Sequence, residues 1–295
     1  MLKLNGVLPP LTTPFDHEGN LYRTKVAHNV SRLNAVALIG YVVGGSSGES
    51  PLLSTNERIQ LFEWVKEAAA DGKALIAGTA TESVRETVCI VNRAAEIGYH
   101  AALVLGPRYF RSLMHRPDTQ ALFYRAVADQ VRIPILIYNF PNVTGYDLPV
   151  ETIAALSEHP NIIGMKDSAG NVEKLGATVK AVKAGFQVLS GSGTTFWPAL
   201  QAGAAGGILA FADCAPYACL TIWEAFRTRD YEAAEDWQNR ILLAAKLVTA
   251  TYGIPGLKHA MDLNGYYGGP PRLPLIPASA EARAEIEQAL QGIKS

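Results

Sequence analysis

The sequence predicts an α/β fold, a (β/α)8 TIM barrel with a small C-terminal helical appendix. Eight short apolar runs recur along the 295 residues, and each is followed by glycine or a small polar residue and then by a helical pattern. The connections are short, which indicates parallel strands. Eight such units match a closed barrel better than an open sheet, which usually has fewer strands. The alternative is an open doubly wound sheet, but no GxGxxG motif follows the first strand.

The predicted elements alternate from the N-terminus. Each strand is a short apolar run, and the eight runs are residues 6–13, 38–45, 74–80, 101–106, 133–140, 162–166, 187–190 and 207–211. Amphipathic segments between them are expected to form the covering helices, including residues 55–70, 83–97, 119–131, 149–157, 172–184 and 195–202.

After Phe211 the pattern becomes helical. Helices are predicted at 218–227, 231–251 and 279–293, and the LKHAM segment of the Gly/Pro-rich stretch 253–277 is a candidate for a further short helix. We therefore expect a catalytic barrel domain at 1–228. Residues 229–295 are expected to form a helical extension packed on the barrel, because they are too few to bury much core alone.

Composition excludes several classes of function. The formal net charge of −1 leaves no electrostatic footprint for nucleic acid or an acidic membrane surface. No apolar run is long enough to span a bilayer, and the N-terminal stretch lacks the apolar core of a secretory signal. The three cysteines, Cys89, Cys214 and Cys219, form no CxxC pair, which favours a reducing compartment. We expect a cytoplasmic protein that binds neither nucleic acid nor membrane.

Chemically capable residues gather where the predicted strands end, which is where this fold places reactive groups. The sixth strand ends on Lys166 after the apolar residues Ile162, Ile163 and Met165. Strand alternation places Tyr138 and Lys166 on neighbouring strands with their side chains in the same barrel, and Gly164 leaves room beside the lysine. Other candidates at strand ends are Ser46, Ser47, Tyr109, Ser168 and Gly191. Asp213 is expected at the rim of the pocket, without an assigned role.

Each of these residues has an ordinary explanation when taken alone: a strand-end lysine is usually solvated, and a Gly/Ser loop is usually a turn. Together they match the needs of Schiff-base chemistry. A buried lysine offers a free amine that can attack a ketone. A tyrosine held by serine hydroxyls can move the protons that dehydration requires, and backbone N–H groups can bind the carboxylate of a 2-oxo acid. The six histidines show no HxH or HExxH spacing, so we expect no metal and no cofactor beyond the covalent substrate.

Three motifs resemble the dihydrodipicolinate synthase / N-acetylneuraminate lyase family of class I aldolases, and the resemblance covers essentially the whole chain. They are Gly45–Glu49 (GSSGE), Tyr138–Pro141 (YNFP) and Gly164–Ser168 (GMKDS). The resemblance implies Lys166 as the nucleophile and Tyr138 as the proton relay.

The same resemblance implies roles for further residues. Ser46 and Ser47 would bind the substrate carboxylate, with Ser46 also serving the relay. Tyr109 matches a tyrosine that reaches a neighbouring subunit's site, which implies a homo-oligomer, either a dimer or a tetramer. The remaining substrate-binding candidates are Ser168, Gly191, Ile208 and Val143.

The position of Val143 bears on the reaction. Dihydrodipicolinate synthases usually carry an arginine there that binds the carboxylate of the aldehyde, and valine forfeits that charge-assisted contact. Asp167 and Ser168 argue against the sialic-acid lyases. The tracts 253–258 and 265–270 resemble 4-hydroxy-2-oxoglutarate aldolases, although Ser47 stands where those tend to carry asparagine.

The leading hypothesis is therefore a lyase that cleaves a 4-hydroxy-2-oxo acid to pyruvate and an aldehyde, with glyoxylate favoured. Two enzymatic alternatives are the synthase reaction, in which pyruvate condenses with aspartate semialdehyde, and cleavage of 2-keto-3-deoxy sugar acids. A barrel that binds 2-oxo acids without turning them over is the non-enzymatic alternative.

Overall fold

The computed structural model describes residues 2–293 and contains eight parallel strands in one sheet of order β1-β8-β7-β6-β5-β4-β3-β2. The strands are β1 (Val7–Leu8), β2 (Gly40–Val43), β3 (Ala74–Thr79), β4 (Ala101–Leu105), β5 (Ile135–Asn139), β6 (Ile162–Asp167), β7 (Gln187–Ser190) and β8 (Gly206–Ile208). A parallel bridge between Pro10 and Val42 joins the two ends, so the sheet closes into the predicted (β/α)8 barrel.

The first strand is much shorter than its apolar run. Residues 6–13 were predicted as a strand, but only Val7 and Leu8 form one. Pro9 and Pro10 follow directly, and proline has no N–H to donate to a ladder. The proline carbonyl groups can still accept hydrogen bonds, and Val42 donates its N–H to the oxygen of Pro9 at 3.0 Å. The barrel seam therefore depends on a few hydrogen bonds beyond the named strand.

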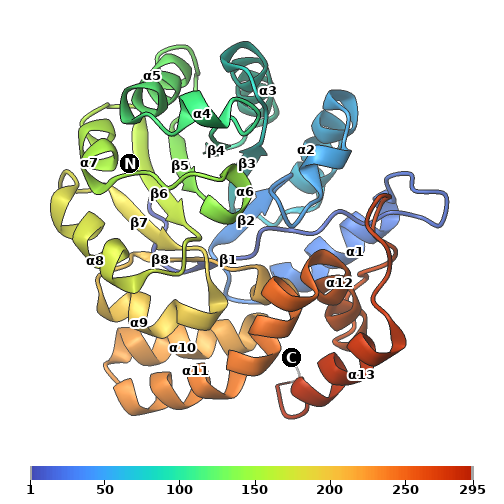
Figure 1. Ribbon diagram of the computed structural model, residues 1–295. Helices are drawn as coiled ribbons and strands as arrows, with labels where there is room; N and C mark the ends of the chain where they lie inside the picture. The colour runs from blue at the N-terminus through green and yellow to red at the C-terminus, as the bar shows by residue number, and fades with distance from the viewer. Residues whose placement is uncertain (1, 294–295) are drawn as a thin grey trace.

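Helices follow the strands, and most of them cover the outside of the barrel (Figure 1). In chain order they are α1 (Arg23–Asn34), α2 (Thr55–Ala68), α3 (Val84–Ile97), α4 (Arg111–Met114), α5 (Pro117–Ala128), α6 (Pro141–Thr144), α7 (Val150–Ser157), α8 (Val172–Ala181), α9 (Phe196–Gln201) and α10 (Pro216–Thr228), with short turns η1 (Ser50–Leu52), η2 (Gly193–Thr195) and η3 (Ala210–Asp213). The sequence prediction did not include α1, α4 or α6. The last two have four residues each, too few for helical periodicity to register.

Two apolar layers separate the inside of the barrel from its outside. Side chains such as Leu8, Val42, Leu103, Leu136 and Ile208 fill the barrel interior. A larger cluster lies between the strands and the helices. Because side chains alternate along a strand, each buried strand contributes to both layers. The interior is therefore packed with side chains, and the chemistry is expected at its mouth.

The C-terminal part contains α11 (Tyr231–Lys246), the π-helical turn η4 (Leu247–Thr251), α12 (Gly253–Leu263) and α13 (Ala280–Ala289). The predicted helix over 231–251 thus ends in a π turn, and α12 begins inside the stretch expected to be a loop with one short helix. In Figure 1, α11 lies alongside α10, and α12 and α13 lie together near the C-terminus. The proposed domain boundary at residue 228 stays a prediction.

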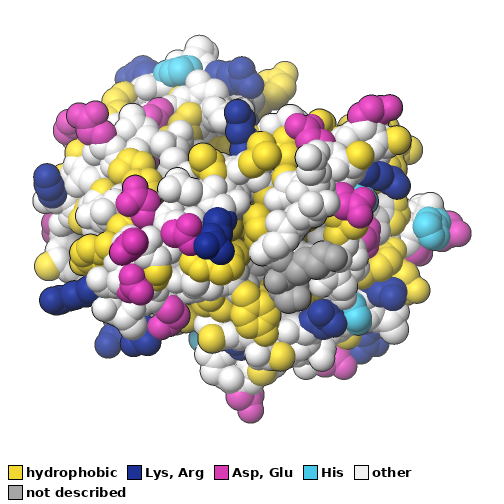
Figure 2. All heavy atoms as spheres, turned by 90° about the horizontal axis from the view of Figure 1, so that it is seen from below, with side chains coloured by type: hydrophobic (Ala, Val, Ile, Leu, Met, Phe, Trp, Pro, Cys, Tyr) yellow, Lys and Arg dark blue, Asp and Glu magenta, His cyan; other side chains and the backbone are white. Residues whose placement is uncertain are grey.

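The surface agrees with the near-zero net charge. Basic and acidic side chains are interspersed on the face shown in Figure 2, without a field of one sign. All three cysteines are free, with Cys214 and Cys219 buried. Among residues 2–293, no helix combines the length and apolar character that crossing a bilayer requires.

Candidate active site

The side chains of Lys166 and Tyr138 meet inside the carboxyl end of the barrel. Tyr138 on β5 is the register partner of Lys166 on β6, so the two side chains emerge on the same face of the sheet. The lysine Nζ donates a hydrogen bond of 3.2 Å to the phenolic oxygen. Both residues are only 5% exposed. The alternation argument therefore predicted this contact correctly, and the amine is shielded from bulk water.

The tyrosine ring is fixed in a stack. It lies nearly parallel to Phe140, with ring centroids 5.5 Å apart and an interplanar angle of 20°. Lys166 Nζ also lies 4.4 Å from the centroid of the Tyr138 ring. The phenol thus has one orientation, with its oxygen beside the amine.

Glycines keep the space around Lys166 narrow but open. Gly164 shares the inward face, and a Cβ there would come within 2.4 Å of the Gln187 carbonyl oxygen. A Cβ on Gly191 would lie 2.0 Å from Ser168 Oγ and 3.0 Å from Lys166 Cε. Only hydrogen fits at these two positions. Strands β6 and β7 therefore approach each other closely beside Lys166.

Ser168 and Ile208 occupy the surroundings of the lysine in different ways. Ser168 Oγ is buried and has no hydrogen-bond partner among the described residues. A buried orphan hydroxyl is unusual in a folded protein and is available to a ligand. Ile208 is fully buried in the barrel interior, where it packs with the other inward side chains. Its side chain can therefore bound the lower side of a substrate at the barrel mouth.

The loop after β2 carries the predicted carboxylate-binding residues. Ser46 and Ser47 are half-buried in a tight turn, in which Gly48 and Glu49 donate their N–H groups to the oxygens of Gly45 and Ser46, both at 3.1 Å. The backbone N–H groups of Ser46 and Ser47 donate to no acceptor in the described part of the chain. Among residues 2–293, no hydrogen bond joins either serine to Tyr138, so the expected serine–tyrosine contact is not formed.

Tyr109 does not reach the Lys166 site of its own chain. Its side chain is 80% exposed, and its ring packs edge-on against Phe110, with centroids 5.2 Å apart. Its backbone N–H donates to the Glu82 carboxylate at 2.9 Å. Val143, by contrast, packs against the barrel-interior cluster together with Phe140. The isopropyl group therefore lies on the side of the mouth that carries Tyr138.

A polar network behind Lys166 links β5 and β6. The amide nitrogen of Asn139 donates to Asp167 at 2.9 Å and to Asp147 at 2.8 Å. The same Asp167 oxygen accepts the N–H of Ala169 at 3.0 Å. Burial raises the pKa of Asp167, and the hydrogen bonds from Ala169 and Asn139 oppose this rise. The network faces away from the barrel interior and fixes the backbone on which Lys166 is mounted.

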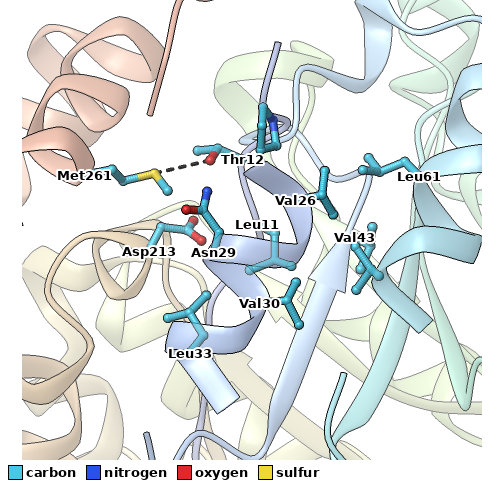
Figure 3. Close-up of a pocket in the computed structure, with 12 residues that line it drawn as sticks. Leu11, Thr12, Val26, Asn29, Val30, Leu33, Val43, Leu61, Asp213 and Met261 are labelled. Carbon is cyan, nitrogen blue, oxygen red and sulfur yellow. Dashed lines mark hydrogen bonds between the residues drawn. The ribbon is translucent and has the colours of Figure 1, made fainter. Parts of the chain in front are cut away.

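Asp213 lies deeper than the expected pocket rim. It is fully buried, and neither carboxylate oxygen has a hydrogen-bond partner among the described residues. It lines a cavity with Thr12, Asn29 and Met261, shown in Figure 3. The cavity has a volume of about 10 Å³. It can hold one water molecule but not an oxo acid. Burial raises the pKa of Asp213 well above its usual range, and the charge of Lys166 opposes the rise.

Three groups near the site have no role predicted from the sequence. Asn139 lies inside the YNFP motif, next to Tyr138. Glu49 is the last residue of the GSSGE motif, and Lys258 is the last residue of the tract 253–258. In the structure Glu49 and Lys258 form a buried ion pair. A charged residue within an apolar, glycine-rich stretch was the one available signal. Within residues 2–293, no cluster of three or more His, Cys, Asp or Glu side chains could hold a metal ion.

Comparison with known proteins places the geometry in a family. The sequence model of the Dihydrodipicolinate synthetase family matches residues 3–293. The chain belongs to this family. Members are class I, pyruvate-dependent aldolases, and this protein is accordingly a lyase that works through a lysine Schiff base without a metal cofactor.

Relatives of this dihydrodipicolinate synthetase family protein include 4-hydroxy-tetrahydrodipicolinate synthases. One from Synechococcus elongatus is 32% identical over 292 residues and covers 96% of this chain and 94% of the relative. Another, from Methanococcoides burtonii, is 34% identical over 280 residues and covers 94% of each. A solved structure of the chloride-inhibited dihydrodipicolinate synthase of Acinetobacter baumannii, complexed with pyruvate, has a TM-score of 0.92 at 28% identity and covers 99% of this chain and 100% of that one. These names favour the alternative, the synthase reaction, over 4-hydroxy-2-oxoglutarate cleavage.

Proposed function

We propose that this aldolase forms its Schiff base on Lys166 and uses Tyr138 as the proton relay. The observation that carries the proposal is the 3.2 Å contact between the buried amine and the phenol. The amine attacks the pyruvate carbonyl carbon, and the resulting carbinolamine loses water as the phenol supplies and recovers protons. Loss of a methyl proton from the imine then gives an enamine, whose carbon attacks the aldehyde.

The pyruvate carboxylate is assigned to the loop after β2. Within the described residues 2–293, the N–H groups of Ser46 and Ser47 have no acceptor, and backbone N–H groups in such turns bind anions. Ser168 Oγ, buried without a partner, is a further donor beside Lys166. Gly191, which follows the neighbouring strand β7, and Ile208 on β8 limit the space around the substrate.

The first candidate for the aldehyde is aspartate semialdehyde. It is favoured by the synthase names of the relatives at 32% and 34% identity. The second candidate reaction is cleavage of a 4-hydroxy-2-oxo acid such as 4-hydroxy-2-oxoglutarate. It is favoured by Val143, which packs at the mouth where the synthases usually carry a carboxylate-binding arginine. A 2-keto-3-deoxy sugar acid belongs to the same second class.

One pair of assays separates the candidates. A coupled reductase assay measures product formation from pyruvate and aspartate semialdehyde. A lactate dehydrogenase assay measures pyruvate released from 4-hydroxy-2-oxoglutarate. The synthase proposal expects kcat/KM for the first reaction to exceed that for the second. The reverse order would select the cleavage reaction, and turnover of neither would leave sugar-acid substrates for the same lactate dehydrogenase assay.

The imine itself has an independent test. Enamine formation exchanges the methyl protons of pyruvate with solvent, so NMR in D2O is expected to show exchange with the native protein. Lys166→Met is expected to abolish it. Exchange that survives in this variant would move the nucleophile elsewhere. Pyruvate binding without exchange in the native protein would favour the non-catalytic, oxo-acid-binding barrel.

We also propose a homo-oligomer, a dimer or a tetramer, in which Tyr109 acts in the site of a second copy. Tyr109, Phe110 and Leu113 are exposed by 80%, 60% and 54%, an apolar surface suited to burial between subunits. Mixing Tyr109→Ala with Lys166→Met chains tests this, because a hybrid restores one intact site. Recovery of activity on mixing supports action across the interface, and a strictly additive mixture contradicts it. The cytoplasmic location stays a prediction.

A further inference from the structure

The structure contains a second buried lysine, Lys258 on α12, whose side chain is 1% exposed. Its Nζ lies 2.6 Å from Oε1 of Glu49, whose side chain is fully buried. It also donates hydrogen bonds of 2.9 Å to the carbonyl oxygens of Thr13 and Pro270. The ammonium group thus has two carbonyl acceptors, and the Glu49 carboxylate is its counter-ion. Lys258 is therefore engaged as a cation and is unavailable as a nucleophile, in contrast to Lys166.

Glu49 uses its second oxygen to hold another part of the C-terminal region. Oε2 accepts the backbone N–H of Arg272 at 2.8 Å. The Arg272 guanidinium in turn donates to Glu57 at 2.6 Å and to the carbonyl of Leu52 at 2.8 Å. Both cations also lie over the ring of Phe15, Nζ of Lys258 at 4.7 Å and Cζ of Arg272 at 4.3 Å. One carboxylate thus ties the loop after β2 to α12 and to the segment that follows it.

The backbone at Glu49 shows that this tie holds a specific conformation. Glu49 adopts φ of 55°, a left-handed conformation that is unfavourable for residues other than glycine. Thr13 Oγ1 donates to the neighbouring Gly48 carbonyl at 2.6 Å, which clamps the turn from the other side. Removal of one partner of the buried ion pair would leave the other charge buried alone, which is strongly destabilising.

Glu49 lies only three residues beyond Ser46, and its N–H donates to the Ser46 carbonyl at 3.1 Å. Its position therefore determines where the free N–H groups of Ser46 and Ser47 point. We propose that Glu49 and Lys258, supported by Arg272, are positioning residues that aim these N–H groups at the carboxylate of the oxo-acid substrate. The C-terminal helical region thereby sets the affinity of the barrel for pyruvate. This inference rests on the proposed function of Lys166 and of the loop after β2.

The test compares pyruvate with acetone, a ketone that lacks the carboxylate. Imine formation on each is measured by borohydride trapping as a function of ketone concentration. Glu49→Gln is expected to weaken pyruvate trapping about tenfold or more, because the redirected N–H groups of Ser46 and Ser47 lose a charge-assisted contact with the carboxylate. It is expected to leave acetone trapping within about threefold, because the amine and phenol are unchanged. Equal losses for both ketones would mean that the pair only supports folding, and no loss would mean that it does not position the loop.

Two further variants protect the test from a folding defect. Glu57→Gln weakens the hold on Arg272 from a partly exposed site and is expected to shift the pyruvate-to-acetone ratio in the same direction by a smaller factor. Glu67→Gln, which removes the exposed ion pair with Arg23 at 2.8 Å, is the matched control and is expected to leave the ratio unchanged. Absence of any adduct in the native protein would contradict the proposed function itself. If the native protein is trapped but the pyruvate-to-acetone ratio is unaltered in Glu49→Gln and Glu57→Gln, only this inference is overturned.

Discussion

The ε-nitrogen of Lys166 lies 3.2 Å from the phenolic oxygen of Tyr138, and the two residues are register partners across the β5–β6 ladder. The contact needs no loop to adopt a special shape, because it follows from parallel pairing and from the inward side of each strand. Rigid strands hold catalytic groups more precisely than loops do. This relationship supports the expectation that chemistry and substrate binding can be separated by mutation.

Replacing the phenol is expected to affect turnover more than binding. In Tyr138→Phe the ring can keep its stack on Phe140, but the proton relay is lost, so kcat is expected to fall by about 10²- to 10⁴-fold. The pyruvate concentration for half-maximal trapping is expected to change by no more than about threefold. Steady-state kinetics and trapping measure the two effects. Tyr231→Phe, at a half-exposed tyrosine on α11, is the control, and parallel losses of turnover and affinity in Tyr138→Phe would show that the hydroxyl is only a binding contact.

Val143 is expected to determine the preference for the acceptor. Val143→Arg places a guanidinium at the mouth, where it can pair with a carboxylate on the aldehyde. We expect the ratio of kcat/KM for aspartate semialdehyde to that for an uncharged aldehyde to rise about tenfold or more. Leu122→Arg adds the same charge at an exposed position on α5 and is expected to leave the ratio unchanged. An unaltered ratio in Val143→Arg would mean that residue 143 does not contact the acceptor.

Gly191 is expected to tolerate no side chain. A Cβ there would lie 2.0 Å from Ser168 Oγ and 2.9 Å from the Asp167 carbonyl oxygen, so Gly191→Ala must displace the strand that carries Lys166. We expect a loss of activity of about tenfold or more, since small shifts of reacting groups are costly. Gly176→Ala is the control, because its Cβ meets Ala202 only at an ordinary 3.4 Å. Full activity of Gly191→Ala would show that β6 and β7 can separate freely.

The buried carboxyl of Asp213 is expected to make stability fall as pH rises. Burial raises its pKa in the folded protein above the value in the unfolded chain, so the folded state holds the proton more tightly. The stabilisation is complete below about pH 4 and is lost as pH rises toward the folded-state pKa, by at most about 1.4 kcal/mol per pH unit. Asp213→Asn removes this loss and is expected to unfold at higher urea concentration than the native protein at pH 8.

The advantage of Asp213→Asn is expected to shrink as pH falls toward 4, because both side chains are then neutral. Asp236→Asn, at an exposed ion pair with Arg240, is expected to show no such pH-dependent gain. Equal or lower stability of Asp213→Asn at pH 8 would contradict a buried carboxyl whose pKa is raised by desolvation.

The sequence predicted what depends on local pattern. Six of the eight strands lie close to their apolar runs, and strand alternation was sufficient to bring Tyr138 and Lys166 together. The run 207–211 is a strand only over 207–208, because the chain turns into η3 at Ala210. The short β1 has a local cause too, because Pro9 and Pro10 lack the N–H that a strand donates. Short helices such as α4 and α6 fall below the length at which periodicity is visible.

Contacts between residues far apart in the sequence could not be predicted from local sequence patterns. Glu49 and Lys258 are far apart in the sequence, and nothing in the spacing of either motif indicates that one neutralises the other. The depth of Asp213 depends on how η3, α1 and α12 pack, which no single segment reveals. The expected hydrogen bond between a loop serine and Tyr138 is not formed within residues 2–293. It depends on the distance between a loop and a strand, whereas the pattern predicts only that both lie at the same end of the barrel.

The most direct test of the central assignment is borohydride reduction in the presence of pyruvate, followed by mapping of the modified peptide. We predict one reduced pyruvate adduct per chain, on Lys166, and none on Lys258, whose nitrogen is held by Glu49, Thr13 and Pro270. An adduct on any other lysine, or no adduct at saturating pyruvate, would contradict the assignment of Lys166 as the nucleophile.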